Sequence, residues 1–109
     1  MTQAKRVFIT GGASGLGRAL ALRYARDGWR VCIADLNDER GESTRAELAA
    51  AGAAEALYRH ADVTCEADLQ AIADELAQIW GGLDVLVNNA GVAQAGAIED
   101  VTLADWEWI

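Results

Sequence analysis

A glycine-rich stretch near the amino terminus has the residue types and spacing to bind a phosphate group. Residues 7–17 read Val-Phe-Ile-Thr-Gly-Gly-Ala-Ser-Gly-Leu-Gly, which is a short apolar run followed by glycines. A strand that turns into a helix in this way directs backbone N–H groups and the positive helix end at one point, where an anion is stabilised. We assign Gly11 to a tight turn, Gly15 to close approach of a pyrophosphate, and Gly17 to close packing of the helix on the sheet. A plain turn without a ligand is the alternative, because glycine-rich turns are common in unrelated loops.

An acidic residue follows at a separation typical of a dinucleotide site. Asp35 ends the next apolar run, 18 positions after Gly17. A carboxylate there accepts hydrogen bonds from the hydroxyls of an adenosine ribose and repels a 2′-phosphate; two like charges about 4 Å apart repel by on the order of a few kcal/mol. No Arg or Lys lies between Gly11 and Gly17 or directly after Asp35. The pattern therefore favours NAD over NADP, and the alternative is that Asp35 merely starts a turn with Asn37.

Two further polar segments follow later apolar runs, namely Asp62-Val63 and the run Asn-Asn-Ala-Gly at 88–91. Together with the pattern Thr-Gly-x-x-x-Gly-x-Gly at 10–17, they give a chain that resembles the short-chain dehydrogenase/reductase family. The resemblance covers residues 7–109 and corresponds to the first half of a typical member. It implies an NAD-dependent oxidoreductase that acts on a secondary alcohol/ketone pair, of which this chain supplies the cofactor-binding half.

The resemblance also implies roles for single residues. Asp62 would bind the adenine amino group, with Val63 packed on the ring; from the residues alone, Asp62 as a cap of the following helix is almost as good an interpretation. Asn89 would contact the cofactor, while small Ala90 and Gly91 leave room for a ribose. The cofactor site expected from motif and resemblance together comprises Gly11, Ala13, Ser14, Gly15, Leu16, Gly17, Asp35, Leu36, Asp62, Val63, Asn89, Ala90 and Gly91.

The catalytic residues of the family have no counterpart here. Family members use a tyrosine acid/base whose pKa is lowered by a lysine four residues later, with a serine and an asparagine. The only tyrosines are Tyr24 and Tyr58, followed four positions later by Gly28 and Asp62, and the only lysine is Lys5. We therefore assign no catalytic residue. A stand-alone, non-catalytic dinucleotide-binding or interaction module remains the alternative function.

Strands and helices alternate along the chain, which predicts an α/β fold. Right-handed crossovers give a Rossmann-type, doubly wound parallel sheet of order 3-2-1-4, with the ligand crevice where the first and fourth strands end. The sequence predicts strands at 6–10, 30–35, 56–61 and 83–87, and helices at 15–27, from 37 or 38 to 51, from a Thr64 cap to 80, and from 102.

Composition limits the remaining choices. The 109 residues suffice for one dinucleotide-binding domain, residues 1–109. A net charge of −8 disfavours nucleic acid and anionic membrane as partners. No apolar run is long enough to span a membrane and no signal-peptide core precedes the first strand, so we expect a cytoplasmic protein with a small-molecule substrate.

We expect no metal site: Cys32 and Cys65 lack ligand spacing, and His60 should lie at the surface or cap a strand end. We expect the full-length parent to be a homo-oligomer.

Overall fold

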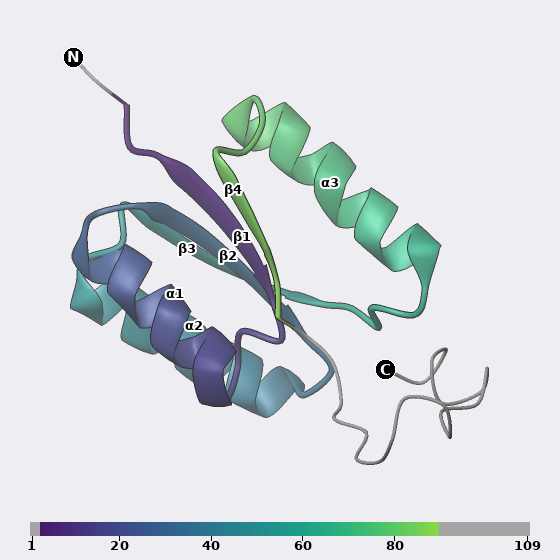
Figure 1. Cartoon of the computed structure of the whole chain (residues 1–109), viewed down its shortest axis with the longest axis horizontal. Helices are drawn as coiled ribbons and strands as arrows, with labels where there is room; N and C mark the ends of the chain where they lie inside the picture. The colour runs from purple at the N-terminus through teal and green to yellow at the C-terminus, as the bar shows by residue number, and fades with distance from the viewer. Residues whose placement is uncertain (1–2, 90–109) are drawn as a thin grey trace, which may run out of the picture.

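The computed structural model describes residues 3–89 as a parallel four-stranded sheet with helices on both faces (Figure 1). The strand order is β3-β2-β1-β4, which confirms the predicted Rossmann-type sheet. Helices α1 and α2 cover one face and α3 covers the other (Figure 1). Among the described residues no helix is long and apolar enough to cross a membrane. In chain order the elements are β1 (Arg6–Thr10), α1 (Gly15–Arg26), β2 (Arg30–Asp35), α2 (Asp38–Ala51), β3 (Glu55–His60), α3 (Glu66–Trp80) and β4 (Val85–Asn88).

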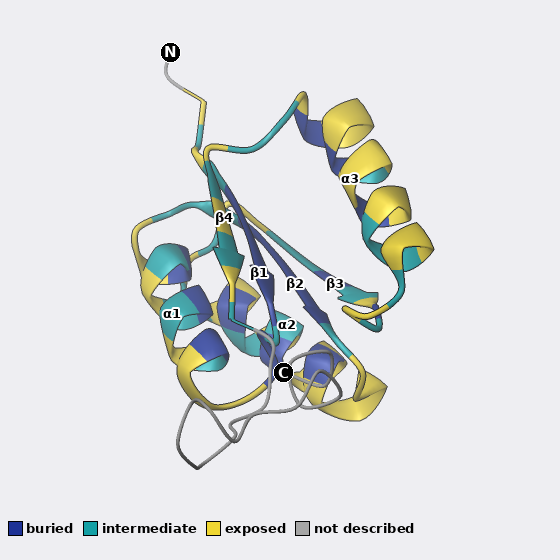
Figure 2. Cartoon of the chain, turned by 45° about the vertical axis from the view of Figure 1, so that its right-hand side comes forward, coloured by how far each residue is buried: buried dark blue, intermediate teal, exposed yellow. Residues whose placement is uncertain are grey.

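The two central strands are buried on both faces, which explains their uninterrupted apolar runs. Successive side chains of a strand point to opposite faces, so β1 contributes to two separate cores. Val7 and Ile9 pack with α1 and α2, whereas Phe8 packs with α3. Figure 2 shows β1 and β2 buried and the outer faces of the helices exposed. The core on the α3 side also contains Cys32, Ala34, Ala61, Ile72, Leu76 and Trp80.

Helices α1 and α3 each bury residues at four-residue spacing against the sheet. In α1 the buried residues are Gly17, Ala21 and Ala25, and Leu16, which the sequence analysis places in the cofactor site, is 67% exposed. In α3 the four-residue spacing of Ile72, Leu76 and Trp80 defines the buried stripe, and Ile79 is 48% exposed. The small buried side chains of α1 let this helix approach the sheet closely.

Most element ends follow local chemistry. The Asn37 side chain caps α2 by accepting a hydrogen bond from the Arg40 N–H at 3.0 Å, and Gly81 ends α3 with a φ of 77°. The predicted Thr64 cap of α3 is wrong. Cys65 occupies the cap position, and the Thr64 hydroxyl instead donates to the Asp62 carboxylate at 2.6 Å.

Two strand boundaries also shift. Strand β3 lies one residue earlier than predicted, and β4 covers Val85–Asn88 instead of 83–87. The residue before β4 explains its late start, because the Asp84 carboxylate accepts hydrogen bonds from the Arg6 backbone N–H at 2.8 Å and from its guanidinium at 3.1 Å. The helix predicted from residue 102 lies outside the described residues.

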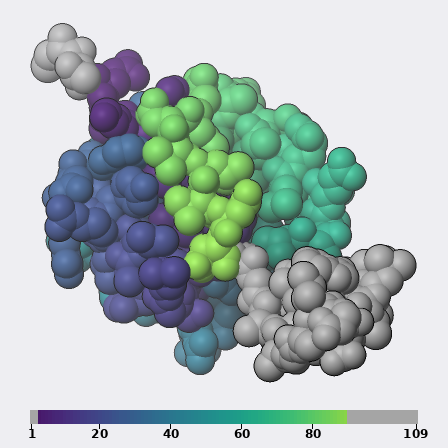
Figure 3. All heavy atoms as spheres, viewed as in Figure 1, coloured from purple at the N-terminus to yellow at the C-terminus, as the bar shows by residue number. Residues whose placement is uncertain are grey.

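Strand β4 forms an edge of the described sheet. It pairs with β1, and no strand within residues 3–89 pairs with its other side. Leu86 is 55% exposed, and Figure 3 shows β4 running across the surface between the two helical layers. An open strand edge beside apolar side chains favours pairing with another chain.

We therefore expect the 109-residue chain by itself to associate or aggregate, and Leu86→Lys to reduce this association by placing a charge on the edge strand. Analytical ultracentrifugation measures the effect. Ile79→Lys, at a similarly exposed position on α3, is the control and should leave association unchanged. A monodisperse monomer with sharp near-UV tryptophan bands would contradict this prediction.

Candidate cofactor-binding site

Parallel pairing brings the carboxyl ends of all four strands to one edge of the sheet. In the ladder Thr10 lies beside Ala34 of β2 and Asn88 of β4, and Asp35 lies beside His60 of β3. The glycine-rich turn, Leu36, the Asp62–Val63 segment and Asn89 therefore follow the strand ends at the same edge. This is the edge at which ligands bind in open α/β sheets.

The glycine-rich turn depends on missing side chains. Gly11 has a φ of 66° and donates its N–H to the Ala34 carbonyl at 2.8 Å. A Cβ on Gly17 would lie 2.1 Å from the Gly11 carbonyl oxygen, whereas a Cβ on Gly15 would meet nothing within 4 Å. Gly12, which has no role in the predicted motif, is also required, because a Cβ there would lie 2.5 Å from the Ile33 Cγ2 atom. The turn is therefore closely packed against the protein at Gly12 and Gly17, and open at Gly15.

The start of α1 has the properties of an anion site. Ser14 occupies the cap position but its side chain makes no capping hydrogen bond, and the first turn contains no acidic residue. Helix α2 differs, because its first turn contains Asp38 and Glu39. A helix end whose first N–H groups are neither capped by a side chain nor faced by a carboxylate stabilises a phosphate group. The residues present thus fit the pyrophosphate of a dinucleotide.

Asn89 braces the turn from the neighbouring strand end. Its side-chain amide donates to the Gly11 carbonyl oxygen at 3.2 Å, and its backbone N–H donates to the Thr10 hydroxyl at 3.1 Å. These contacts confirm the expected bracing of nearby backbone for the Asn89 amide. The contact of Asn89 with a cofactor stays a prediction, and Ala90 and Gly91 lie outside the described residues.

Asp35 ties the glycine-rich turn to the end of β2. One carboxylate oxygen accepts a hydrogen bond from the Ala13 N–H at 3.1 Å, and the other accepts from the N–H groups of Leu36 at 2.8 Å and Asn37 at 3.4 Å. The turn with Asn37, offered as the alternative role, is therefore present. A carboxylate has about four lone-pair positions and three of them accept these N–H groups, so about one position is left for a ribose hydroxyl.

The segment after β3 presents one ionised and one apolar side chain. The Thr64 hydroxyl and N–H both donate to the Asp62 carboxylate, and these hydrogen bonds hold the pKa of Asp62 below its usual value. Val63 is 40% exposed, and Leu36, at the end of β2, is 59% exposed. Exposed apolar side chains at neighbouring strand ends suit the two faces of an adenine ring.

Comparison with known proteins decides the family. Residues 5–109 match the family model for short chain dehydrogenases. The chain belongs to the short-chain dehydrogenase family. It is 42% identical over 103 residues to a sorbitol dehydrogenase of Cereibacter sphaeroides, covering 94% of this chain and 39% of that protein. It is 41% identical over 105 residues to a 3-alpha-(or 20-beta)-hydroxysteroid dehydrogenase of Mycobacterium tuberculosis (strain ATCC 25618 / H37Rv), covering 96% of this chain and 39% of that protein.

The fold agrees with this assignment. A metagenomic short-chain oxidoreductase in complex with NADP superposes with a TM-score of 0.83 at 30% identity, covering 96% of this chain and 48% of that structure. The chain thus spans about two-fifths of the length of the two dehydrogenases and about half of the solved oxidoreductase.

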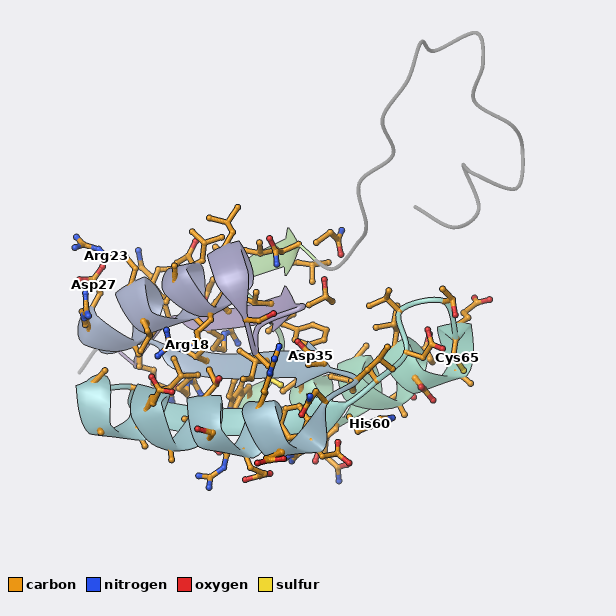
Figure 4. All side chains as sticks on the ribbon, turned by 90° about the horizontal axis from the view of Figure 1, so that it is seen from below. Arg18, Arg23, Asp27, Asp35, His60 and Cys65 are labelled. Carbon is orange, nitrogen blue, oxygen red and sulfur yellow. The ribbon has the colours of Figure 1, made fainter. Side chains whose placement is uncertain are left out.

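Tyr58 is not the acid/base tyrosine of short-chain dehydrogenases. It is 6% exposed, and its single O–H is shared between two acceptors, the Asp38 carboxylate at 2.6 Å and the Asp35 carbonyl oxygen at 3.0 Å. Burial raises the pKa of Tyr58, and the Tyr58 hydrogen bond lowers the pKa of Asp38. His60 also contacts Asp38, with Nδ1 2.9 Å from its carboxylate, and Figure 4 places His60 beside the start of α2. Tyr58 supports the end of β2 that carries Asp35.

The packing of the turn leaves no room for a side chain at Gly17. Alanine favours an ordinary helix by about 1 kcal/mol over glycine, but here its Cβ would overlap the Gly11 carbonyl. We expect Gly17→Ala to lower the free energy of unfolding by about 1–3 kcal/mol, as overpacking does. Ser14→Ala, which removes no capping hydrogen bond, should change it by less than about 0.5 kcal/mol. Urea denaturation of the full-length protein measures both changes, and a Gly17→Ala variant as stable as the wild type would refute the packing role of Gly17.

Proposed function

We propose that this chain is the cofactor-binding half of an NAD(H)-dependent oxidoreductase that acts on a secondary alcohol/ketone pair, with residues 1–109 forming its dinucleotide-binding domain. The observation that carries the proposal is the open glycine-rich turn at the uncapped start of α1, with Asp35 bonded to the same turn through Ala13.

Each part of the dinucleotide has candidate partners. The N–H groups at the start of α1 would hold the pyrophosphate, and the Asp35 carboxylate would accept a hydrogen bond from the adenosine ribose. Leu36 and Val63 would flank the adenine ring, and the Asp62 carboxylate would accept a hydrogen bond from the adenine amino group. The nicotinamide supplies the hydride chemistry when the cofactor is bound.

Asp35 supports NAD(H) as the preferred cofactor. Its fixed negative charge would face an adenosine 2′-phosphate, and no cation stands in residues 11–17 to offset it. The metagenomic oxidoreductase was solved with NADP, so the family name does not decide between the two cofactors.

The substrate is proposed only as a class. The two dehydrogenases compared above are named for sorbitol and for hydroxysteroids, which are chemically different alcohols. A small-molecule secondary alcohol or its ketone is common to both. The cytoplasmic location and the homo-oligomeric state of the full-length protein remain predictions.

A second candidate is a stand-alone, non-catalytic dinucleotide-binding module. It is favoured by the absence of a Tyr-x-x-x-Lys pair from the 109 residues. The intact mass of the protein in its source separates the two, because the module should have the 11.6 kDa of this sequence and the oxidoreductase a larger mass.

Nicotinamide absorbance tests the proposed reaction. The full-length protein should transfer hydride with members of a panel of polyols and hydroxysteroids, using NAD(H). The 109-residue chain alone should transfer none. Turnover by the chain alone, after removal of host dehydrogenases, would contradict the catalytic assignment, as would a full-length protein inactive with every secondary alcohol and ketone of the panel.

A further inference from the structure

An open pocket of about 440 Å³ lies between α1 and α2, beside the glycine-rich turn. Ala13 lines this pocket, and its N–H is the group that donates to the Asp35 carboxylate. On the α2 side, the Thr44 hydroxyl donates to the Ala13 carbonyl oxygen at 3.5 Å. The pocket is therefore separated by a single residue from the position proposed for the adenosine ribose.

The lining of this pocket contains groups that bind phosphate. Arg18 comes from α1, and Arg40, Ser43 and Thr44 come from α2. Guanidinium and hydroxyl groups are common phosphate ligands, and Arg40 makes no ion pair with any residue in the range 3–89. Both arginines lie outside the glycine-rich turn and are not directly after Asp35, so the sequence pattern around the motif did not indicate them.

Two carboxylates offset these cations. Glu39 and Glu47 also line the pocket, and the Glu47 carboxylate forms an ion pair with the Arg18 guanidinium. Figure 4 shows Arg18 in the space between α1 and α2. The two arginines and two glutamates sum to a formal charge of zero, and the nearby Asp35 makes the neighbourhood negative. An arginine that is already paired with a carboxylate binds a phosphate less strongly, and the Glu47 charge would also repel the phosphate.

We propose that Glu47 is a specificity-determining residue: by binding Arg18 it weakens the affinity of this pocket for an adenosine 2′-phosphate. It acts alongside Asp35, which repels the same phosphate from the other side of Ala13. This inference rests on the proposed function, because it presupposes a dinucleotide in the site. The side chains of Arg18 and Glu47 are 41% and 40% exposed, so solvent screens the pair and its effect is smaller than that of Asp35.

Glu47→Gln in the full-length protein tests the proposal by calorimetric titration with NADPH and NADH. Removing the carboxylate frees Arg18, so the affinity for NADPH should rise by roughly three- to tenfold while the affinity for NADH changes by less than about twofold. Glu42→Gln is the matched control. It makes the same charge change on the same helix, in a residue that pairs with Arg45 at 2.8 Å and does not line the pocket, and it should not improve NADPH binding.

The double variant Arg18→Gln/Glu47→Gln distinguishes a freed arginine from a general change of charge. It should bind NADPH about as weakly as the wild type, and Arg18→Gln alone should bind NADPH no better. Equal gains in Glu47→Gln and Glu42→Gln, no gain in either, or a gain that survives in the double variant would each overturn the role of Glu47. Retained NADH binding verifies that each variant is folded, and loss of NADH binding by Glu47→Gln would also overturn a role confined to specificity.

The wild-type titration tests the underlying cofactor assignment separately. A wild-type protein that binds NADPH at least as tightly as NADH refutes the proposed NAD(H) preference before any variant is made. An NAD(H)-preferring wild type with an unresponsive Glu47→Gln variant refutes only the role of Glu47.

Discussion

Replacing Asp35 by asparagine should reduce the preference for NADH over NADPH by roughly tenfold or more, since it removes the charge that would face the 2′-phosphate. The amide oxygen can still accept a hydrogen bond from the N–H of Ala13 or Leu36, so the turn keeps part of its support. Asp35→Ala loses both the charge and these acceptors. We expect it to narrow the same preference and also to weaken NADH binding.

Calorimetric titration of both cofactors measures the effect, and Asp27→Asn is the control. Asp27 pairs with Arg23 at 3.5 Å at the far end of α1 from Asp35, as Figure 4 shows, so its removal changes the net charge without changing the site. An unaltered cofactor preference in Asp35→Asn would show that Asp35 serves the fold alone.

The largest loss of stability should follow from Trp80→Ala. Trp80 is 5% exposed in the core under α3, its Nε1–H donates to the Glu55 carboxylate at 2.9 Å, and the Arg30 guanidinium lies 5.7 Å from its ring centre. We expect the free energy of unfolding to fall by about 3–5 kcal/mol, because a large buried side chain is replaced by a cavity. Trp80→Phe keeps most of the packing and should lose less.

Urea denaturation of the full-length protein, followed by far-UV circular dichroism, measures these changes. Ile79→Ala is the matched control, because Ile79 is adjacent on α3 but 48% exposed; it should cost less than about 1 kcal/mol. Similar losses at positions 79 and 80 would mean that α3 does not pack on the sheet through Trp80.

The fold follows from patterns that are local in the sequence. Continuous apolar runs identify strands buried on both faces, and the alternation of strands with helices fixes the parallel sheet and its order. Asn37 and Gly81 set helix ends through contacts within a few residues. The prediction for Thr64 was wrong because its hydroxyl has two possible local partners, the N–H groups at the start of α3 and the Asp62 carboxylate. It donates to the Asp62 carboxylate and does not cap α3.

The parts of the site that were missed depend on contacts between distant segments. Gly12 is required by Ile33 of the neighbouring strand, so no local pattern distinguishes it from a spare turn glycine. Arg18 and Glu47 meet only because α1 and α2 pack side by side on one face of the sheet. The glycine motif predicts where the phosphates of a dinucleotide would bind, but the charged side chains around that position are brought together only by tertiary packing.

Calorimetric titration of the wild-type full-length protein with NADH and NADPH, in one buffer at one salt concentration, tests the central claim most directly. We predict saturable binding of NADH with a dissociation constant at least about tenfold below that for NADPH, as expected from a fixed carboxylate facing the 2′-phosphate. Equal or tighter binding of NADPH, or no binding of either dinucleotide, would contradict the account of this site.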